Sequence, residues 1–232
     1  MDAMTLFPLG ERLPDDLLMR RDRLPLKPEP VTLDGKYVHL APLVLDRDVA
    51  SLFAISNGTP VKVGEREVGS YDADALIWRY LFAGPFATPG ALASFLGDIQ
   101  TTQNFLPLTV FDAPTRRHIG FAAYTNNAPQ HLKVELGHIW YSPVAQGTNA
   151  NLEASYLMLR HAFDLGYRRV EWKCDSLNER SRRAALRIGF RFEGIQEAHF
   201  IIKGRTRDTA WFRMLDREWP SERSRLEQML YG

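Results

Sequence analysis

Hydrophobic and polar positions alternate along this chain with two different periods, which predict helices and strands. Apolar residues three or four positions apart predict helices at residues 46–55, 71–82, 88–99, 151–165 and 178–188. Alternating or continuous apolar runs predict strands at residues 36–40, 106–112, 118–125, 134–141, 170–174, 192–203 and 206–215. This order of elements indicates one mixed sheet flanked by helices, an α/β (α+β) fold. Asp46 is expected to cap the first of these helices.

Proline and charge divide the chain into three segments. Residues 1–35 contain closely spaced prolines, which disfavour a helix interior and a central strand, so an extended arm laid over the domain is expected, with a short helix near residues 15–20. Residues 36–219 carry the periodic segments and predict a single domain. Residues 220–232 are predicted to form a charged C-terminal tail that can adopt a short helix.

Composition narrows the class of protein. The 232 residues are 45% hydrophobic, which is enough for one full core. A net charge of +1 favours neither nucleic acid nor an anionic membrane as a partner. No apolar run approaches the roughly 18 residues of a membrane span, and the N-terminal residues do not resemble a secretory signal. The single cysteine, Cys174, fits a reducing compartment, so a cytoplasmic protein is expected.

A turn of small polar residues precedes the strongest predicted helix and follows the strand at 134–141. Its residues are Gln146, Gly147, Thr148, Asn149, Ala150 and Asn151. Such a turn directs several backbone N–H groups and the positive end of a helix dipole to one point, where a diphosphate would fit. Taken alone, the turn is read more simply as a polar helix start with Asn149 as its cap.

The chain resembles the Rim-like branch of the GNAT-superfamily N-acetyltransferases, which groups ribosomal-protein and small-amine acetyltransferases. The resemblance covers about residues 36–219 and is strongest in five segments: 135–143, 146–153, 166–178, 181–190 and 203–211. It implies a mostly antiparallel central sheet of about six to seven strands, two of which splay apart to admit the pantetheine of acetyl-CoA. It also implies direct transfer of an acetyl group from acetyl-CoA to a primary amine. No metal is expected, because the six histidines and the single cysteine show no metal-ligand spacing. A monomer or a homodimer is expected.

The resemblance assigns acetyl-CoA contacts to the strand, the turn and two helices. The residues expected to bind acetyl-CoA are Trp140, Tyr141, Ser142, Gln146, Gly147, Thr148, Asn149, Ala150, Asn151, Asn178 and Arg183. Asn149 stands where the family commonly has a second glycine, and asparagine tolerates left-handed backbone better than most residues. A backbone N–H of residues 140–142 is expected to polarise the thioester carbonyl. Asn178 can also cap its helix, and the two roles can coexist.

Two catalytic residues are expected: Glu135, which the resemblance implies, and Ser181, which is a substitute for an acid that the family has and this chain lacks. A base must remove the proton of an ammonium group before the amine can attack a thioester, and Glu135 aligns with the family's catalytic glutamate. Asp175 is the second candidate, and His138 is the third, provided that a bulge turns it to the side of Glu135. A purely structural Glu135, paired with an arginine at the sheet edge, is the simpler alternative.

The family's usual general acid, which protonates the leaving thiolate, is missing from this chain. Family members often place a tyrosine four residues after Ser181, whereas this chain has Ala185 there. Ser181, Tyr141 or a water molecule is therefore expected to serve, if any group does. Cys174 is expected to be a core residue and not a nucleophile.

The amine acceptor is expected to enter between the segment before Pro85 and the hairpin at 196–215, although their side chains can equally belong to the core. The candidate acceptor contacts there are Trp78, Tyr80, Phe82, Phe86, His199 and Trp211. The acceptor can be a small amine, an aminoacyl compound or a protein N-terminus.

Two other classes of function stay open. A catalytically silent acyl-CoA-binding module would explain Ala185 and the changed glycine. An RNA-binding module would use a run of arginines, against which the near-neutral charge argues. That run consists of Arg180, Arg182, Arg183 and Arg187, for which a solvated helix face or a contact to the 3′-phosphate of CoA are the alternative readings.

Overall fold

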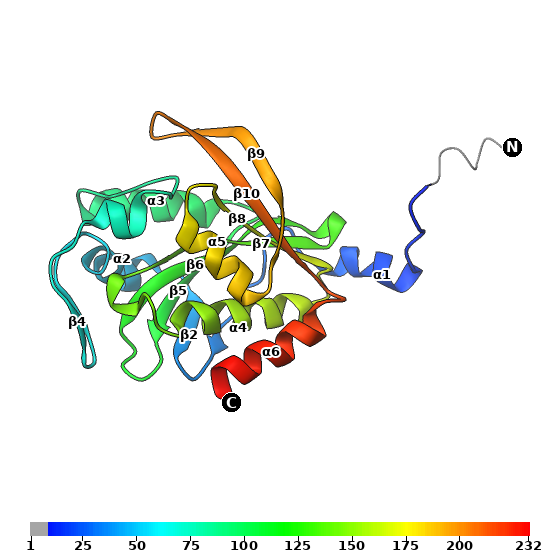
Figure 1. Cartoon of the computed structure of the whole chain (residues 1–232), viewed down its shortest axis with the longest axis horizontal. Helices are drawn as coiled ribbons and strands as arrows, with labels where there is room; N and C mark the ends of the chain where they lie inside the picture. Colours follow the sequence, from blue (N-terminus) through cyan, green and yellow to red (C-terminus); the bar gives the residue numbers. More distant parts are fainter. Residues whose placement is uncertain (1–8) are drawn as a thin grey trace, which may run out of the picture.

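Eight strands form one twisted sheet in the computed structural model of the chain, which describes residues 9–232 (Figure 1). Their order is β1-β2-β5-β6-β7-β8-β10-β9, and only β7 and β8 pair in parallel. The strands are β1 (Leu33–Asp34), β2 (Val38–Pro42), β5 (Leu106–Asp112), β6 (His118–Ala128), β7 (Lys133–Tyr141), β8 (Arg169–Asp175), β9 (Arg191–Ile202) and β10 (Arg205–Leu215). The predicted mixed, mostly antiparallel sheet is confirmed. Its eighth strand, β1, is too short to show an alternating pattern.

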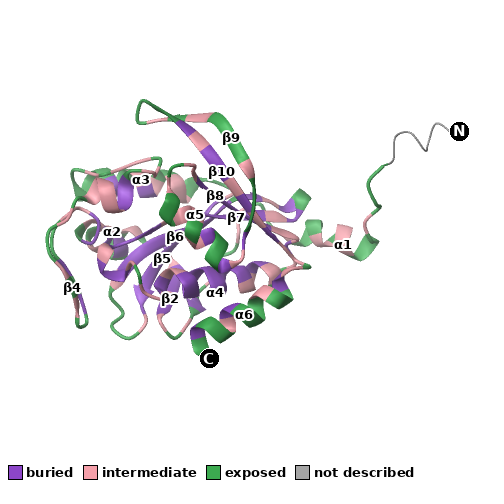
Figure 2. Ribbon diagram, in the orientation of Figure 1, coloured by how far each residue is buried: buried purple, intermediate pink, exposed green. Residues whose placement is uncertain are grey.

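Six α-helices surround the sheet, and the buried residues concentrate in the central strands and along α4 (Figure 2). The helices are α1 (Asp15–Arg20), α2 (Leu45–Ala54), α3 (Pro89–Thr101), α4 (Ala150–Asp164), α5 (Glu179–Ile188) and α6 (Trp219–Tyr231). Helices α2 and α3 pack together beside β5 and β6, whereas α4 packs with α5 and α6. A small hairpin, β3 (Val61–Val63) and β4 (Arg66–Val68), was not predicted because each strand has only three residues.

The helix predicted at residues 71–82 is wrong in extent, since only one π-helical turn, Asp74–Trp78, forms there. The Trp78 side chain is 2% exposed and donates from Nε1 to the carbonyl of Ser56. The Trp78 carbonyl accepts from the N–H of Leu81 and from Nζ of Lys203, at the tip of the β9–β10 hairpin. Tertiary packing of this segment therefore replaces the helical hydrogen bonds that its periodicity favours.

Strands β7 and β8 separate after a short parallel pairing. Their register runs from Lys133↔Arg169 to Leu136↔Trp172, and β7 then continues to Tyr141 with no β8 partner. A bulge follows in β7, where two residues, His138 and Ile139, face a single residue of β6. His138 has a left-handed backbone there, with φ of 52°. The splay predicted from the resemblance is confirmed, and it leaves a wedge-shaped opening in the sheet.

The N-terminal arm and the C-terminal tail contact the domain in different ways. Residues 1–8 of the predicted arm lie outside the described residues. The same residues begin the N-terminal stretch that does not resemble a secretory signal. Beyond α1, the arm runs over the domain, where Lys27 Nζ donates to the carbonyls of Gln100 and Thr102. The C-terminal tail forms α6, which lies beside α4 (Figure 1) and buries Leu226 and Leu230.

A buried carboxylate, Asp48, joins α2 to the sheet. It is fully buried and accepts hydrogen bonds from the N–H of Val44, from Thr109 Oγ1 and from Arg47, while Nε2 of His118 lies 2.9 Å away. Asp48 therefore satisfies the start of α2, and the expected cap at Asp46 is wrong, because Val44 occupies the N-cap position. Burial acts to raise the pKa of Asp48, but these hydrogen bonds outweigh it and hold the pKa well below its usual range.

Replacing Asp48 should destabilise the fold strongly. Asp48→Ala leaves Arg47 and Thr109 without their partner, which we expect to lower the free energy of unfolding by about 3–5 kcal/mol. Because the pKa is depressed in the folded state, the contribution of Asp48 is present above its unfolded pKa and is lost as the pH falls below about 4. Urea titration at neutral and acidic pH tests both effects. A loss below about 1 kcal/mol would contradict this role for Asp48, since that is typical of an ordinary single substitution.

Candidate active site

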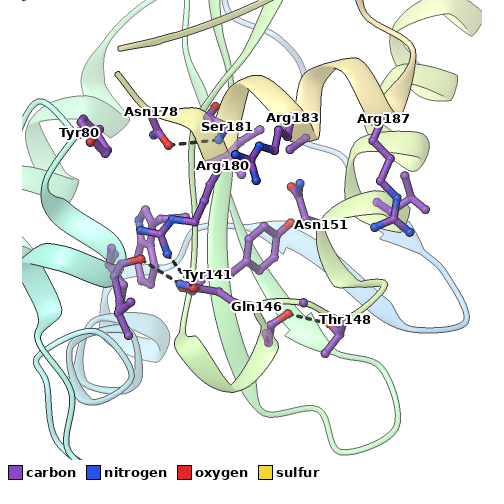
Figure 3. Close-up of a pocket in the computed structure, with 18 of the residues that line it drawn as sticks. Tyr80, Tyr141, Gln146, Thr148, Asn151, Asn178, Arg180, Ser181, Arg183 and Arg187 are labelled. Carbon is purple, nitrogen blue, oxygen red and sulfur yellow. Dashed lines mark hydrogen bonds between the residues drawn. The ribbon is translucent and has the colours of Figure 1, made fainter. Parts of the chain in front are cut away.

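Two adjoining cavities lie where β7 and β8 separate. The first, of about 580 Å³, is bounded by the turn before α4, by α5 and by residues 75–80 (Figure 3). The second, of about 460 Å³, is bounded by β7, β8, residues 80–82 and the β9–β10 hairpin. Five residues line both cavities: Tyr80, Ile139, Trp172, Asn178 and Ser181. A molecule in the first cavity can therefore reach a molecule in the second.

The first cavity is positively charged. Four arginines and no carboxylate of residues 9–232 line it: Arg79, Arg180, Arg183 and Arg187. Arg79 pairs with Asp74 and Arg183 with Glu179, so the excess positive charge comes from Arg180 and Arg187. Three of them lie on one face of α5, whereas Arg182 turns away and donates to the carbonyl of Ser176. Arg180 reaches across to Gln146 Oε1 at 3.3 Å and to the Ala75 carbonyl at 2.8 Å (Figure 3). Such a lining suits a ligand with several negative charges.

The turn before α4 owes its shape to Gly147. Gly147 has φ of +73°, and a Cβ built on it would meet no atom within 4 Å, so its backbone is open to the first cavity. Asn149 has φ of −74° and makes no side-chain cap bond, so the tolerance of asparagine for left-handed backbone is not used. Asn149 occupies the N-cap position of α4, as the simpler reading expects, but its side chain forms no capping hydrogen bond. Instead, Thr148 Oγ1 accepts from the N–H of Ala150 and donates to the carbonyl of Ala145.

Two buried polar atoms in the first cavity lack a partner among residues 9–232. They are Tyr141 Oη and Asn151 Oδ1, and both residues line the cavity. Burial raises the pKa of Tyr141 above its ordinary value, so its phenol keeps the proton and can donate it in a hydrogen bond. Because buried polar atoms are normally satisfied, this pair fits a ligand that carries both donors and acceptors, as the amides and phosphates of CoA do.

Eight of the eleven residues predicted to bind acetyl-CoA line the first cavity. The eight are Trp140, Tyr141, Gln146, Gly147, Thr148, Asn151, Asn178 and Arg183. Ser142, Asn149 and Ala150 lie outside the lining. The N–H of Ser142 donates to the Ile119 carbonyl, so it is not free to polarise a thioester. Asn178 accepts from the N–H of Ser181 and lines both cavities, so capping and ligand contact are compatible.

The second cavity contains the predicted base, Glu135. Its side chain is about 7% exposed, and its Oε2 accepts from Lys173 Nζ and from Asn126 Nδ2, both at 2.8 Å. Burial raises the pKa of Glu135, and the nearby Lys173 opposes that shift. The alternative of an arginine partner at the sheet edge is wrong, because the partner is a lysine and β7 is an interior strand. Glu135 is thus a buried carboxylate that faces a cavity.

The other candidate bases differ in position. His138 lines the second cavity because of the β7 bulge, and burial lowers its pKa to about 4, which leaves it neutral at physiological pH. Asp175 lies outside this cavity, and its Oδ1 accepts from the N–H of Leu177. The fold therefore brings Glu135 and His138 together and excludes Asp175.

Ser181 lies at the junction of the cavities. Its Oγ accepts a hydrogen bond from Trp172 Nε1 at 3.0 Å, which leaves its own hydroxyl proton available. Ala185 is fully buried, so its position cannot present a general acid. Among the predicted acceptor contacts, Tyr80 and Phe82 line the second cavity, whereas Trp78 and His199 do not.

Sequence reasoning missed Arg79 as a site residue. It reaches the first cavity from the segment after the π-helical turn, which lies far from the turn before α4 in the sequence. Nothing in the local pattern of a solvent-facing arginine distinguishes it from other arginines. Trp172 was likewise not predicted as a site residue, although it lines both cavities.

Cys174 borders the second cavity but has the properties of a core thiol. It is 5% exposed, and burial raises its pKa, which keeps the sulfur protonated. A thiolate, not a thiol, is the nucleophile in cysteine chemistry. Cys174→Ala should therefore retain turnover, measured by CoA release, with the thermal melt as a check on folding. Loss of all turnover in a folded variant would instead indicate a covalent mechanism.

Comparison with known proteins places the chain in a family. A family model described as an acetyltransferase (GNAT) domain matches residues 60–191, more than half of the chain. The chain belongs to the GNAT acetyltransferase family. It is therefore an acyl-CoA-dependent N-acetyltransferase. No match was found among curated proteins.

Solved structures agree with this assignment. The fold is similar to that of a GCN5-related N-acetyltransferase from Brucella melitensis, with 37% identity, a TM-score of 0.79, and coverage of 89% of this chain and 88% of that one. A probable GNAT-family acetyltransferase from Chromobacterium violaceum has 33% identity and a TM-score of 0.76, with coverage of 92% and 99%.

A more distant similarity concerns the Rim-like branch. An acetyltransferase from Salmonella typhimurium that modifies the N-terminal serine of ribosomal protein L7/L12 has 14% identity and a TM-score of 0.66, with coverage of 80% and 99%. At that identity, only the shared fold follows. Within residues 9–232, no helix combines the length and the apolar character needed to cross a bilayer.

Proposed function

We propose that this GNAT acetyltransferase transfers an acetyl group from acetyl-CoA directly to a primary amine while both substrates are bound. The observation that carries the proposal is the junction of two cavities, one positively charged and one containing a buried carboxylate, at five shared residues. Such an arrangement holds a thioester and an amine side by side, which removes most of the entropic cost of their encounter. The cytoplasm, where acetyl-CoA is made and used, is the expected location.

Acetyl-CoA binding is assigned to the first cavity. The open backbone of Gly147 and the start of α4 provide N–H groups and a positive dipole end for the diphosphate. The arginines of α5 supply positive charge, and one of them, Arg183 in our assignment, contacts the 3′-phosphate. Tyr141 and Asn151 offer a donor and an acceptor to the amides of the pantetheine arm.

Amine activation is assigned to Glu135. An ammonium group in the second cavity gives its proton to the carboxylate, and the neutral nitrogen then attacks the thioester carbonyl. A C–N bond forms, the C–S bond breaks and CoA leaves as a thiolate. The nitrogen loses a second proton as the amide forms, which balances the proton that the thiolate takes up. The raised pKa of Glu135 makes the carboxylate a stronger base than an exposed glutamate. The backbone at the end of β7, at Trp140 or Tyr141, which pairs with β6 but has no β8 partner, polarises the carbonyl oxygen.

Protonation of the thiolate is assigned to Ser181, with Tyr141 or water as the alternatives. Ser181 lies at the junction of the cavities and keeps its hydroxyl proton, because its Oγ accepts the hydrogen bond from Trp172. Tyr141 Oη has no partner among residues 9–232, but it lines only the first cavity. The junction position favours Ser181.

A screen of amine acceptors, followed by release of free CoA, tests this function. The panel contains small amines, aminoacyl compounds and peptide N-termini, of which the last would place the protein in the Rim-like branch. We expect CoA release that depends on the amine and yields one acetylated amine per CoA. Tight acetyl-CoA binding without acetylation of any amine would favour a silent acyl-CoA-binding module, which the family comparisons do not favour.

A further inference from the structure

A buried arginine without a partner faces the second cavity. Arg207, on β10, is 5% exposed, and its guanidinium forms no hydrogen bond or ion pair with any side chain of residues 9–232. Its Nε is fully buried and unpaired. A buried guanidinium normally has a carboxylate partner, because leaving its charge and its N–H groups unsatisfied costs several kcal/mol. The missing partner points to a ligand.

The charged groups that line the second cavity sum to one positive charge, that of Arg207. Glu135 and Lys173 form an ion pair and cancel, and the buried His138 is neutral. The negative charges of Asp175 and Glu135 act on Arg207, but no carboxylate oxygen of residues 9–232 lies within 4.0 Å of its guanidinium nitrogens. The cavity therefore carries one uncompensated positive charge beside the buried carboxylate of Glu135.

Aromatic rings hold the guanidinium in place. Its central carbon lies 4.5 Å from the centroid of the Phe82 ring and 5.8 Å from that of Phe200. Stacking on aromatic faces fixes the plane of an arginine while leaving the N–H groups at its edge free. Those groups match the two oxygens of a carboxylate in a bidentate hydrogen bond.

We propose that Arg207 binds a carboxylate of the acceptor, so that the acceptors of this enzyme are free amino acids. The amino group then lies toward Glu135 and the carboxylate toward Arg207, within one cavity of about 460 Å³. This assignment rests on the proposed function, since it names the acceptor of the same site. A polyamine or a protein N-terminus has no free carboxylate beside its amine and would leave Arg207 unpaired.

Paired acceptors test the assignment. The free L-amino acids and their carboxamides differ only at the group that would meet Arg207. For the preferred amino acid, we expect kcat/KM to exceed that of its amide by about 10–100-fold, the effect of a charge-assisted hydrogen bond. Replacing the carboxylate by a carboxamide lowers the pKa of the amine, so a larger fraction of the amide substrate carries a neutral, nucleophilic amine at neutral pH. A preference for the amino acid over its amide therefore cannot come from the difference in amine pKa.

Variants of Arg207 connect the preference to this residue. Arg207→Gln should bring the acid-to-amide ratio close to one, mainly through a higher KM for the acid and a much smaller change in KM for the amide. Arg207→Lys keeps the positive charge but loses the bidentate geometry of the guanidinium, so it should give an intermediate acid-to-amide ratio. Arg205→Gln, an exposed arginine on the same strand, is the matched control and should leave the ratio unchanged. Thermal melts show whether each variant folds.

Binding separates failure of this inference from failure of the proposed function. Calorimetry with the protein saturated by CoA measures acceptor binding without turnover, and we expect the amino acid to bind at least about 10-fold more tightly than its amide. Acetylation of amines with no preference for the acid, or a ratio that is the same in Arg207→Gln, would overturn the assignment of Arg207 alone. Preferential binding of the acid with no acetylation of any amine would support Arg207 and overturn the proposed function. If Arg207→Gln alone fails to fold, an unchanged acid-to-amide ratio in Arg207→Lys would overturn the assignment of Arg207.

Discussion

Glu135→Gln is expected to lower turnover by about 10²-fold, within the usual range for loss of a general base. Glutamine keeps the shape of the side chain and can still accept from Lys173 and Asn126, but it cannot take a proton. Acetyl-CoA binding should be nearly intact, because Glu135 lines the second cavity and not the first. Steady-state rates and calorimetry measure the two effects separately.

The pH dependence of this variant gives an independent check. The wild-type kcat/KM should rise with pH as the carboxyl group of Glu135 ionises, at a pKa that burial raises above the ordinary glutamate value. Glu135→Gln should lose that part of the profile. Glu171→Gln is the matched control, because Glu171 is a buried, ion-paired carboxylate opposite Glu135 on β8 that lines neither cavity. It should keep the Glu135 part of the profile and shift it to lower pH, because the charge of Glu171 raises the pKa of Glu135. An unchanged pH–rate profile in Glu135→Gln would remove Glu135 from the role and favour ordered water.

Gly147→Val is expected to abolish the thermal stabilisation of the protein by acetyl-CoA. A ligand at 100 times its Kd stabilises the folded state by about 2.7 kcal/mol when it binds only that state. Valine at φ of +73° strains the turn, and its side chain would occupy the open space where the backbone meets the diphosphate. Thermal melts with and without acetyl-CoA measure the effect.

Gly204→Val controls for the strain of a positive φ. Gly204 has φ of +72°, also has open space around its Cβ position, and lies at the tip of the β9–β10 hairpin outside the first cavity. This variant should be destabilised similarly but keep its response to acetyl-CoA. Tight binding of acetyl-CoA by Gly147→Val would show that the diphosphate site lies elsewhere.

The strands and long helices were predictable because their periodicity follows directly from burial. The run from Leu106 to Asp112 is buried throughout, and α4 buries the helically spaced Leu152, Tyr156 and Leu159 together with the residues between them. The segment at 71–82 has helical spacing, yet it forms a single π-helical turn, because Trp78 and Lys203 make contacts across 125 positions of sequence. Local pattern does not contain such long-range contacts.

The part of the candidate site that comes from one continuous sequence motif was predictable. The turn at Gly147 and the strand before it are contiguous in the sequence, so most of the first cavity followed from them. The β7 bulge, which turns His138 into the second cavity, depends on pairing with β6 and has no signature in the sequence. Arg207 was not singled out, because its missing partner is visible only when every neighbouring side chain is in place.

The most direct test of the account follows the acetyl group itself. The enzyme is incubated with labelled acetyl-CoA, first alone and then with an amine acceptor, and the intact protein, the CoA and the amine are measured by mass spectrometry. Direct transfer predicts an unmodified protein throughout, with free CoA and acetylated amine appearing in equal amounts only after the amine is added. An acetyl group on Cys174 before the amine is added, or CoA release without any acetylated amine, would contradict it.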